Sequence, residues 1–153
     1  MQPDVVTNRK ALRDYHILDR YEAGIVLKGT EVKSIRAGKA NLSDAFARVE
    51  NGEAFLYGAD IQPYEKASFE NHLPKRPRKL LLHRVEIDKL FGLSSVQGHT
   101  IVALKLYFKK GKLKVELGVG KGKHAGDKRE DLKKRAENRE MQREMTRFNR
   151  GHR

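Results

Sequence analysis

The stretch AFARVENGEAFLY, residues 45–57, places the pair Asn51-Gly52 between two segments rich in apolar and aromatic residues. An Asn-Gly pair accepts the positive φ angles of a type I′ turn, whose twist matches that of two antiparallel strands. This stretch therefore predicts a β-hairpin with its turn at residues 51 and 52.

Residues 100–119 contain a second hairpin pattern, in which apolar and polar residues alternate on both sides of Lys110-Gly111. The apolar positions of this alternation are Leu104, Leu106, Phe108, Leu113, Val115, Leu117 and Val119. A period of two puts these side chains on one face of each strand and leaves the opposite face largely basic. Shorter apolar segments at residues 16–18 and 24–27 predict further strands.

Two short helices are predicted among these strands. Residues 29–38 form the first, with Thr30 as its N-cap and Gly38 in a left-handed conformation after the last turn. Residues 85–91 form the second, and Gly92 is expected to end it. Because several short strands have so few helices to cover them, the fold class is expected to be mainly β. A closed antiparallel β-barrel is favoured over a doubly wound sheet.

Composition divides the chain into three parts. Residues 1–8 are expected to form a flexible N-terminal lead, residues 9–120 the barrel, and residues 121–153 a basic tail. The glycines within residues 118–123 predict a flexible hinge at the entrance to this tail.

The tail carries arginines at every fourth position, namely Arg135, Arg139, Arg143 and Arg147. On a helix they would form a ridge about 18 Å long whose charges repel one another. The few apolar residues of the tail form no continuous stripe with which a helix could pack on the barrel. We therefore expect the tail to be disordered in isolation and helical once RNA phosphates neutralise the arginines. An ordinary surface helix is the alternative.

The 153-residue chain has a net charge of +13 and a pI of about 10.0, which favours a nucleic-acid partner over an anionic membrane. It contains no cysteine, so disulfides and thiolate metal sites are excluded. No apolar segment approaches the roughly 20 residues of a membrane span, and the first residues lack the pattern of a secretory signal. A soluble, cytoplasmic protein is expected.

The sequence offers no pattern of catalytic residues. Its six histidines are scattered, without the i,i+4 spacing of a helical metal pair and without flanking acidic ligands. No nucleophile–base pair is recognisable, and residues 118–123 lack the spacing of a phosphate-binding loop. We expect no enzymatic activity, no cofactor and no metal.

Two clusters of basic residues indicate RNA binding. Residues 74–79, PKRPRK, hold four cations and no acid. The second cluster lies on the predicted hairpin and comprises Lys105, Lys109, Lys110, Lys112 and Lys114. Like charges on one protein repel one another, and RNA phosphates would relieve that repulsion. For either cluster alone, a solvated surface is the alternative.

An ordered series of motifs resembles the SsrA-binding protein family, also called small protein B. The series comprises NRKA (8–11), EAGI (22–25), GTEVKSIR (29–36), NH (71–72), RKLLLH (78–83), LYFK (106–109), KV (114–115) and DKR (127–129). The resemblance implies a barrel of the oligonucleotide-binding (OB) type with a few short helices.

The resemblance also implies a function. Members of the family bind transfer-messenger RNA, promote its aminoacylation and bring it to bacterial ribosomes stalled on broken messages. The incomplete product is then tagged for degradation. The tail is implied to lie as a helix in the message channel, next to the decoding centre of 16S ribosomal RNA. Elongation factor Tu and alanyl-tRNA synthetase are further candidate partners, reached through the RNA.

Two other functions remain open as alternatives. One is another barrel that binds the ribosome or ribosomal RNA, such as an initiation factor or a ribosomal protein. The other is a metal-dependent nuclease.

The resemblance assigns RNA contacts by position. It assigns them to Glu31, Leu81, His83 and Lys114. Because a carboxylate repels phosphate, Glu31 is expected to accept hydrogen bonds from base or ribose donors, or to order a nearby cation. For Glu31 the alternative is stabilisation of a helix N-terminus, and for Leu81 it is a place in the core. The other RNA-binding candidates are Lys33, Arg36, Asn71, Arg76, Arg78, Lys79 and Lys105.

Candidate contacts with the ribosome lie in the tail. They are Lys123, His124, Asp127, Lys128, Arg129, Arg135, Arg139, Arg143 and Arg147. Family members usually carry His or an aromatic residue just before Asp-Lys-Arg, a position that Gly126 occupies in this chain. We expect His124 to substitute for that ring, or the contact to be dispensable.

Overall fold

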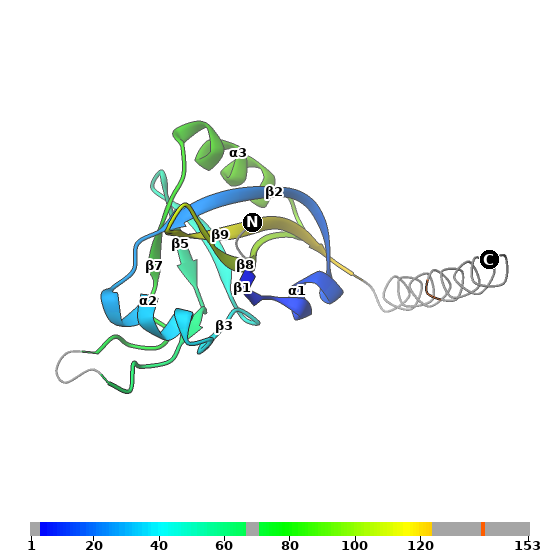
Figure 1. Cartoon of the computed structure of the whole chain (residues 1–153). Helices are drawn as coiled ribbons and strands as arrows, with labels where there is room; N and C mark the ends of the chain where they lie inside the picture. The colour runs from blue at the N-terminus through cyan, green and yellow to red at the C-terminus, as the bar shows by residue number, and fades with distance from the viewer. Residues whose placement is uncertain (1–3, 67–70, 124–138, 140–153) are drawn as a thin grey trace, which may run out of the picture. The chain divides into compact units, whose positions relative to one another are not determined.

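The computed structural model describes residues 4–66, 71–123 and 139. Residues 4–66 and 71–123 form a mainly β fold with a few short helices (Figure 1). The strands are β1 (Asp4–Thr7), β2 (Tyr15–Ile25), β3 (Ala40–Asn41), β4 (Phe46–Glu50), β5 (Glu53–Tyr57), β6 (Asp60–Ile61), β7 (Arg78–Leu81), β8 (His99–Lys109) and β9 (Lys112–Gly122). The helices are α1 (Arg9–Asp14), α2 (Gly29–Arg36) and α3 (Arg84–Ser94). This confirms the predicted fold class at the level of a mainly β protein.

The strands pair antiparallel, in the order β1-β8-β4-β5-β7-β2-β9, and β9 also pairs with β8. Pairings that start at β8 and run through β4, β5, β7, β2 and β9 therefore return to β8. The short strands β3 and β6 form a separate two-stranded sheet. In Figure 1, α3 lies at the top and α2 at the lower left, so the two helices lie at different ends of the strands.

Both predicted hairpins are confirmed. Asn51 and Gly52 have φ angles of 51° and 76° between β4 and β5, as a type I′ turn requires. Lys110 and Gly111 have φ angles of 51° and 77° between β8 and β9. In both places the local sequence determines the turn, and the turn determines the pairing of its strands.

The interior is filled by apolar side chains from every strand of the pairing circuit. They include Ala23, Ala47, Leu56, Leu80, Leu106, Val115 and Leu117. The alternation predicted for β8 and β9 is confirmed for Leu106, Val115, Leu117 and Val119, which lie in this interior. It is wrong for Leu104, which packs in a second cluster with Ala11 and Val102, because the register of β8 shifts between Ala103 and Lys105. Burial at about 25 cal/mol per Å² of apolar surface is the main source of stability for such a core.

The predicted hinge at residues 118–123 is wrong for residues 118–122, which belong to β9. Gly118 is buried, and a Cβ atom there would lie 2.8 Å from Leu104 Cδ1. Gly120 is buried as well, and β9 continues to Gly122 in pairing with β2. Close packing, which the composition does not reveal, explains these glycines. The strand structure therefore ends after residue 122, two residues later than predicted.

The helices differ from their predictions at their ends. The N-cap of α2 is Lys28 and not Thr30, because the Lys28 backbone N–H donates to the Glu31 carboxylate at 2.7 Å. Gly38 follows the C-cap with a φ of 75°, as predicted. Helix α3 passes through Gly92 and ends at Ser94.

Residues 4–8 are part of the fold, so the predicted flexible lead is wrong for them. Strand β1 pairs with β8. Asn8 is buried, and its side-chain amide donates to Leu42 O and Ala103 O, at 2.7 and 2.8 Å. Its Oδ1 caps α1 by accepting from the Ala11 N–H at 3.0 Å. Residues 1–3 lie outside the described residues.

Residues 1–122 and 123–153 form two separate units. In the part of the chain that the structure describes, no helix is long and apolar enough to cross a membrane.

Candidate nucleic-acid interface

A surface groove of about 420 Å³ lies where β2, β7, β9 and the start of α3 meet. Three of the four residues to which the resemblance assigned RNA contacts line it, namely Leu81, His83 and Lys114. Its other lining residues are Glu22, Gly24, Leu82 and Glu86. We refer to this surface as the β2–β7 groove. It combines an apolar side chain, an imidazole and an ammonium group.

The register of the sheet brings these residues together. Gly24 of β2 lies opposite Leu81 of β7 on one side and opposite Lys114 of β9 on the other. A Cβ atom at Gly24 would lie 3.2 Å from the Leu81 Cβ, which is tighter than an ordinary contact. The missing side chain at Gly24 therefore gives Leu81 the room that it occupies, with Lys114 on the other side of this glycine.

Leu81 is a solvent-exposed leucine, with 53% of its surface accessible. Along β7, Arg78 and Leu80 are buried, whereas Lys79 and Leu81 are exposed, as the period of a strand requires. The alternative that Leu81 belongs to the core is therefore wrong, because Leu80 fills that position.

Glu22 is a residue of the groove that sequence reasoning missed. It lies two residues before Gly24 on the same face of β2, where it accepts hydrogen bonds from the Tyr107 hydroxyl and from Lys109 Nζ. The hydrogen bond from Tyr107 lowers the pKa of Glu22 below its ordinary value, and Lys109 adds to this effect. Alternation from the buried Ala23 could have identified Glu22 as outward-facing.

Glu31 and Arg78 form a buried ion pair, and neither side chain is exposed at the surface, where RNA could reach it. The Arg78 Nε donates to Glu31 Oε2 at 2.5 Å, and both side chains are fully inaccessible. Arg76 donates to the same carboxylate from its Nε and Nη2 atoms. Arg78 also donates to Ala59 O and Pro74 O, at 2.7 and 3.0 Å.

The burial of the Glu31–Arg78 pair corrects the prediction that both residues contact RNA. Burial raises the pKa of Glu31, but hydrogen bonds from Arg76, the Lys28 N–H and Arg78 outweigh it and leave the pKa lowered. The ionised carboxylate therefore ties the segment around residues 76–78 to the first turn of α2. Glu31 thereby also stabilises the N-terminus of α2, which was the role expected for it if it did not contact RNA.

The remaining candidates from the barrel have varied surroundings. Lys33 and Arg36 are exposed on α2, above the rings of Tyr64 and Phe108. Lys79 is exposed, and its Nζ lies 3.5 Å from Glu53 Oε1. The Nζ of Lys105 lies 3.2 Å from Glu116 Oε2.

Asn71 has a bracing role within the protein. Its side-chain amide accepts from the Tyr64 N–H and donates to the Tyr64 carbonyl.

A protein-family model described as SmpB protein matches residues 5–147 of this sequence. The chain belongs to the SmpB family.

Relatives of this SmpB chain agree over nearly its whole length. The SsrA-binding protein of Carboxydothermus hydrogenoformans is 57% identical over 145 residues, which cover 95% of this chain and 97% of the relative. That of a Geobacillus species is 60% identical over 139 residues, covering 91% and 90%. Among solved structures, a chain from "tmRNA-SmpB: a journey to the center of the bacterial ribosome" is 50% identical, with a TM-score of 0.69. The match covers 83% of this chain and 93% of that one.

Of the tail candidates in this SmpB chain, the structure describes Lys123, which follows β9, and Arg139, which is helical and exposed. The others lie outside the described residues: His124, Asp127, Lys128, Arg129, Arg135, Arg143 and Arg147. Across residues 4–66 and 71–123, no group of three or more His, Asp or Glu side chains is arranged to hold a metal ion.

Proposed function

We propose that this protein binds transfer-messenger RNA and brings it to stalled ribosomes, where it enables trans-translation, the rescue of the ribosome and the tagging of the incomplete product. Membership in the SmpB family, relatives named SsrA-binding protein and a tmRNA-SmpB structural neighbour support this function. The observation that carries it is the meeting of Leu81, His83 and Lys114 in one groove. The protein acts as an adaptor in the cytoplasm and not as an enzyme.

In the β2–β7 groove, each side chain supplies a different contact to RNA. The Lys114 ammonium binds a phosphate, and Leu81 packs against a ribose or the face of a base. A carboxylate repels phosphate, so Glu22 accepts hydrogen bonds from base amino groups or a ribose 2′-hydroxyl. Glu22 is ionised at neutral pH, since its pKa is lowered from an ordinary value that is already 4.5, and it can therefore accept. Of the remaining cations, Lys33, Arg36, Lys79 and Lys105 add phosphate contacts elsewhere on the surface. Arg76 and Asn71 act indirectly, by bracing the protein.

The pairing circuit β8-β4-β5-β7-β2-β9 is proposed to be a closed barrel of the OB type. Two facts support this: all of its pairings are antiparallel, and the strands share one apolar interior. The β2–β7 groove would then lie on the outer surface of a barrel, as in other proteins of this type that bind nucleic acid.

The tail is proposed to act on the ribosome and not in the first recognition of transfer-messenger RNA. Its Arg135–Arg147 row would become helical along ribosomal RNA phosphates in the message channel. Asp127, Lys128 and Arg129 would contact the decoding centre, next to Gly126, and His124 would take the stacking position. The strand structure reaches Gly122, so residues 123–153 form this unit.

The test is a pull-down of the full chain from bacterial cells, with sequencing of the bound RNA, beside a Lys114→Gln variant and a Lys89→Gln control. Lys89 is exposed on α3 and does not line the groove. One dominant transfer-messenger RNA species is expected, depleted in K114Q and unchanged in K89Q. Ribosomal RNA alone would instead favour a ribosomal or initiation-factor-like protein. RNA cleavage in divalent metal would favour a nuclease.

A further inference from the structure

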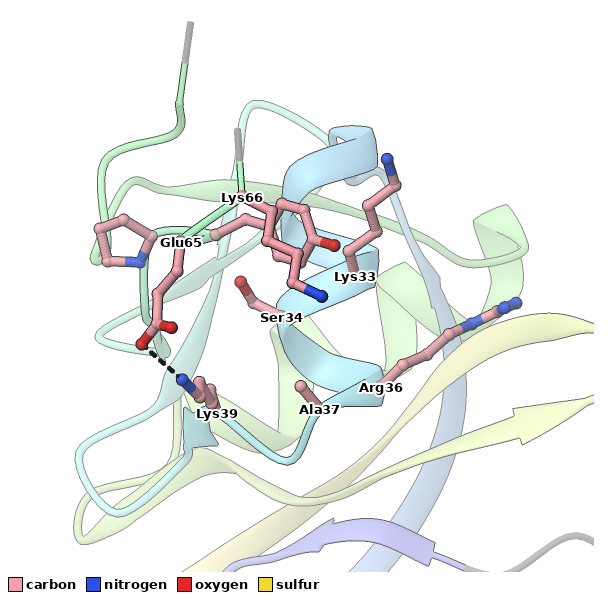
Figure 2. Close-up of a pocket in the computed structure, with 9 residues that line it drawn as sticks. Lys33, Ser34, Arg36, Ala37, Lys39, Glu65 and Lys66 are labelled. Atoms are coloured by element: carbon pink, nitrogen blue, oxygen red, sulfur yellow. Dashed lines mark hydrogen bonds and ion pairs between the residues drawn. The ribbon is translucent and has the colours of Figure 1, made fainter. Parts of the chain in front are cut away.

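A second hollow, of about 430 Å³, lies between α2 and the loop that follows β6 (Figure 2). Its lining residues are Lys33, Ser34, Arg36, Ala37, Lys39, Pro63, Tyr64, Glu65 and Lys66. We refer to it as the α2 hollow. Its volume is within the range of ligand pockets, and it shares no lining residue with the β2–β7 groove.

The loop wall of the α2 hollow is held in place by several contacts. The Gln62 N–H donates to Lys39 O at 3.0 Å. Asn71 hydrogen-bonds both the N–H and the carbonyl of Tyr64, at 3.2 and 2.9 Å. Lys39 and Glu65 form an ion pair at 2.7 Å across the rim, drawn as a dashed line in Figure 2. These contacts hold the loop in a defined position against α2.

One residue that lines the α2 hollow, Ser34, has a buried hydroxyl group. Its side chain is almost completely buried, at 1% exposure, and its hydroxyl has no hydrogen-bond partner within the described residues. Figure 2 shows this hydroxyl turned from α2 toward the loop. A buried hydroxyl without a partner lowers stability, so a bound group or water that reached it would be favoured.

The charge of the α2 hollow selects an anion. Four cations line it, namely Lys33, Arg36, Lys39 and Lys66, against the single carboxylate of Glu65. Lys33 Nζ lies 5.4 Å from the centre of the Tyr64 ring. In Figure 2, Lys66 folds back toward α2, whereas Arg36 points away along the surface. Positive charge and an aromatic ring therefore line the same hollow as Ser34.

We propose that the α2 hollow takes one nucleotide of RNA that is turned out of its base stack. Lys33 and Lys66 hold its phosphate, the Tyr64 ring supports its base, and the Ser34 hydroxyl bonds its ribose or base edge. A phosphorylated peptide would use the cations but would leave the ring unused. This inference rests on the proposed RNA-binding function and adds to it a second subsite, separate from the β2–β7 groove.

The first experiment titrates the full-length, isotopically labelled protein with a pentanucleotide of uridylate while its amide NMR signals are followed. Shifts at Ser34, Ala37 and Tyr64 that saturate with the oligonucleotide are expected. Inorganic phosphate at the same phosphate concentration should shift them far less. Equal shifts with phosphate, tighter binding of a phosphoserine peptide, or shifts confined to Glu22, Leu81 and Lys114 would each overturn the inference.

The second experiment measures the affinity of full-length variants for transfer-messenger RNA. Ser34→Ala should weaken binding between about twofold and tenfold, the effect of one hydrogen bond. Its melting temperature should stay the same or rise, because an unpaired hydroxyl has been removed from the free protein. Lys66→Gln should lower the slope of log affinity against log salt by about 0.7, the effect of one phosphate contact.

Matched controls are Ser43→Ala and Lys89→Gln, both at exposed positions outside the α2 hollow. Affinities of S34A and K66Q equal to those of these controls would rule out the subsite. If only K114Q weakens binding, the β2–β7 groove binds RNA and the α2 hollow does not. If only S34A and K66Q weaken binding, the α2 hollow binds RNA and the β2–β7 groove does not.

Discussion

Glu31 and Arg78, 47 positions apart in the chain, meet as a fully buried ion pair at 2.5 Å. The pair joins the first turn of α2 to the first residue of β7. Two charges without access to water stabilise a protein only while both are present and hydrogen-bonded.

Removing one partner should therefore destabilise the fold strongly. Glu31→Gln leaves Arg78 charged, buried and short of its counter-ion, and we expect a loss of about 3–5 kcal/mol in the free energy of unfolding. Urea unfolding followed by circular dichroism measures it. The matched control is Glu65→Gln, because Glu65 also pairs with a cation but is 79% exposed. It should cost less than about 1 kcal/mol, and equal losses in the two variants would contradict the assigned role of the buried pair.

The same carboxylate should make stability depend on acid pH. The pKa of Glu31 in the folded protein lies below its ordinary value of 4.5. Its contribution is thus fully present above about pH 4.5 and is lost as the pH falls from there through the folded pKa. Unfolding free energies of the wild type and E31Q, measured between pH 7 and 3, should differ most at neutral pH and converge in acid. A constant difference over this range would show that Glu31 is not the titrating group.

Gly24→Ala should weaken RNA binding without unfolding the protein. The new methyl group would lie 3.2 Å from the Leu81 Cβ and would push that side chain by a few tenths of an ångström in the β2–β7 groove. A drop of several-fold in affinity for transfer-messenger RNA is expected. Gly29→Ala is the control, since a Cβ there meets no atom within 4 Å. Equal affinities of the two variants would show that the position of Leu81 does not matter.

Gly118→Ala should affect stability and not binding. Its Cβ would lie 2.8 Å from Leu104 Cδ1 and 3.1 Å from Ile17 Cγ2, in a packed layer. Overpacking of this kind costs about 1–3 kcal/mol, which chemical denaturation would reveal. Gly122, on the same strand, has open space around its missing side chain. G122A should therefore unfold like the wild type, and a similar loss in both variants would refute the packing explanation.

Glu22→Gln tests the acceptor role of this carboxylate. An amide has one oxygen and carries no charge, so it accepts hydrogen bonds from RNA more weakly. Hydrogen bonds to charged groups are worth about 1.5–3 kcal/mol, and we expect at least a tenfold loss of affinity for transfer-messenger RNA. Filter binding at constant salt measures this. An increase in affinity would mean instead that Glu22 acts mainly by repelling phosphate.

The sequence alone predicts the features that depend on neighbouring residues. The turns at Asn51-Gly52 and Lys110-Gly111 follow from local φ preferences, and the alternation in β9 and after the register shift in β8 follows from the strand period. It could not distinguish Leu80 from Leu81 within a run of three leucines, because either could have faced the core. The structure distinguishes them through the register of β7 with β2 and β5.

The site residues show the same limit more sharply. The charges of residues 74–79 predict an exposed basic cluster, yet Arg78 is buried because a carboxylate 47 positions earlier lies within reach. The role of Glu22 depends on Tyr107 and Lys109 in a different strand. The number of charged residues is known from the sequence, but which of them remain available to RNA depends on how the strands pair.

The two-residue turn at Lys110-Gly111 has a consequence for how this protein can vary. It sets the register of β9 against β8, and so determines that Lys114 points outward while Val115 is buried. A single residue inserted there would exchange the two faces of β9, placing an ammonium group in the apolar interior and a valine on the RNA-binding surface. Substitutions can therefore adjust the groove gradually, whereas a change of length at this turn would alter the strand face that carries Lys114 in one step.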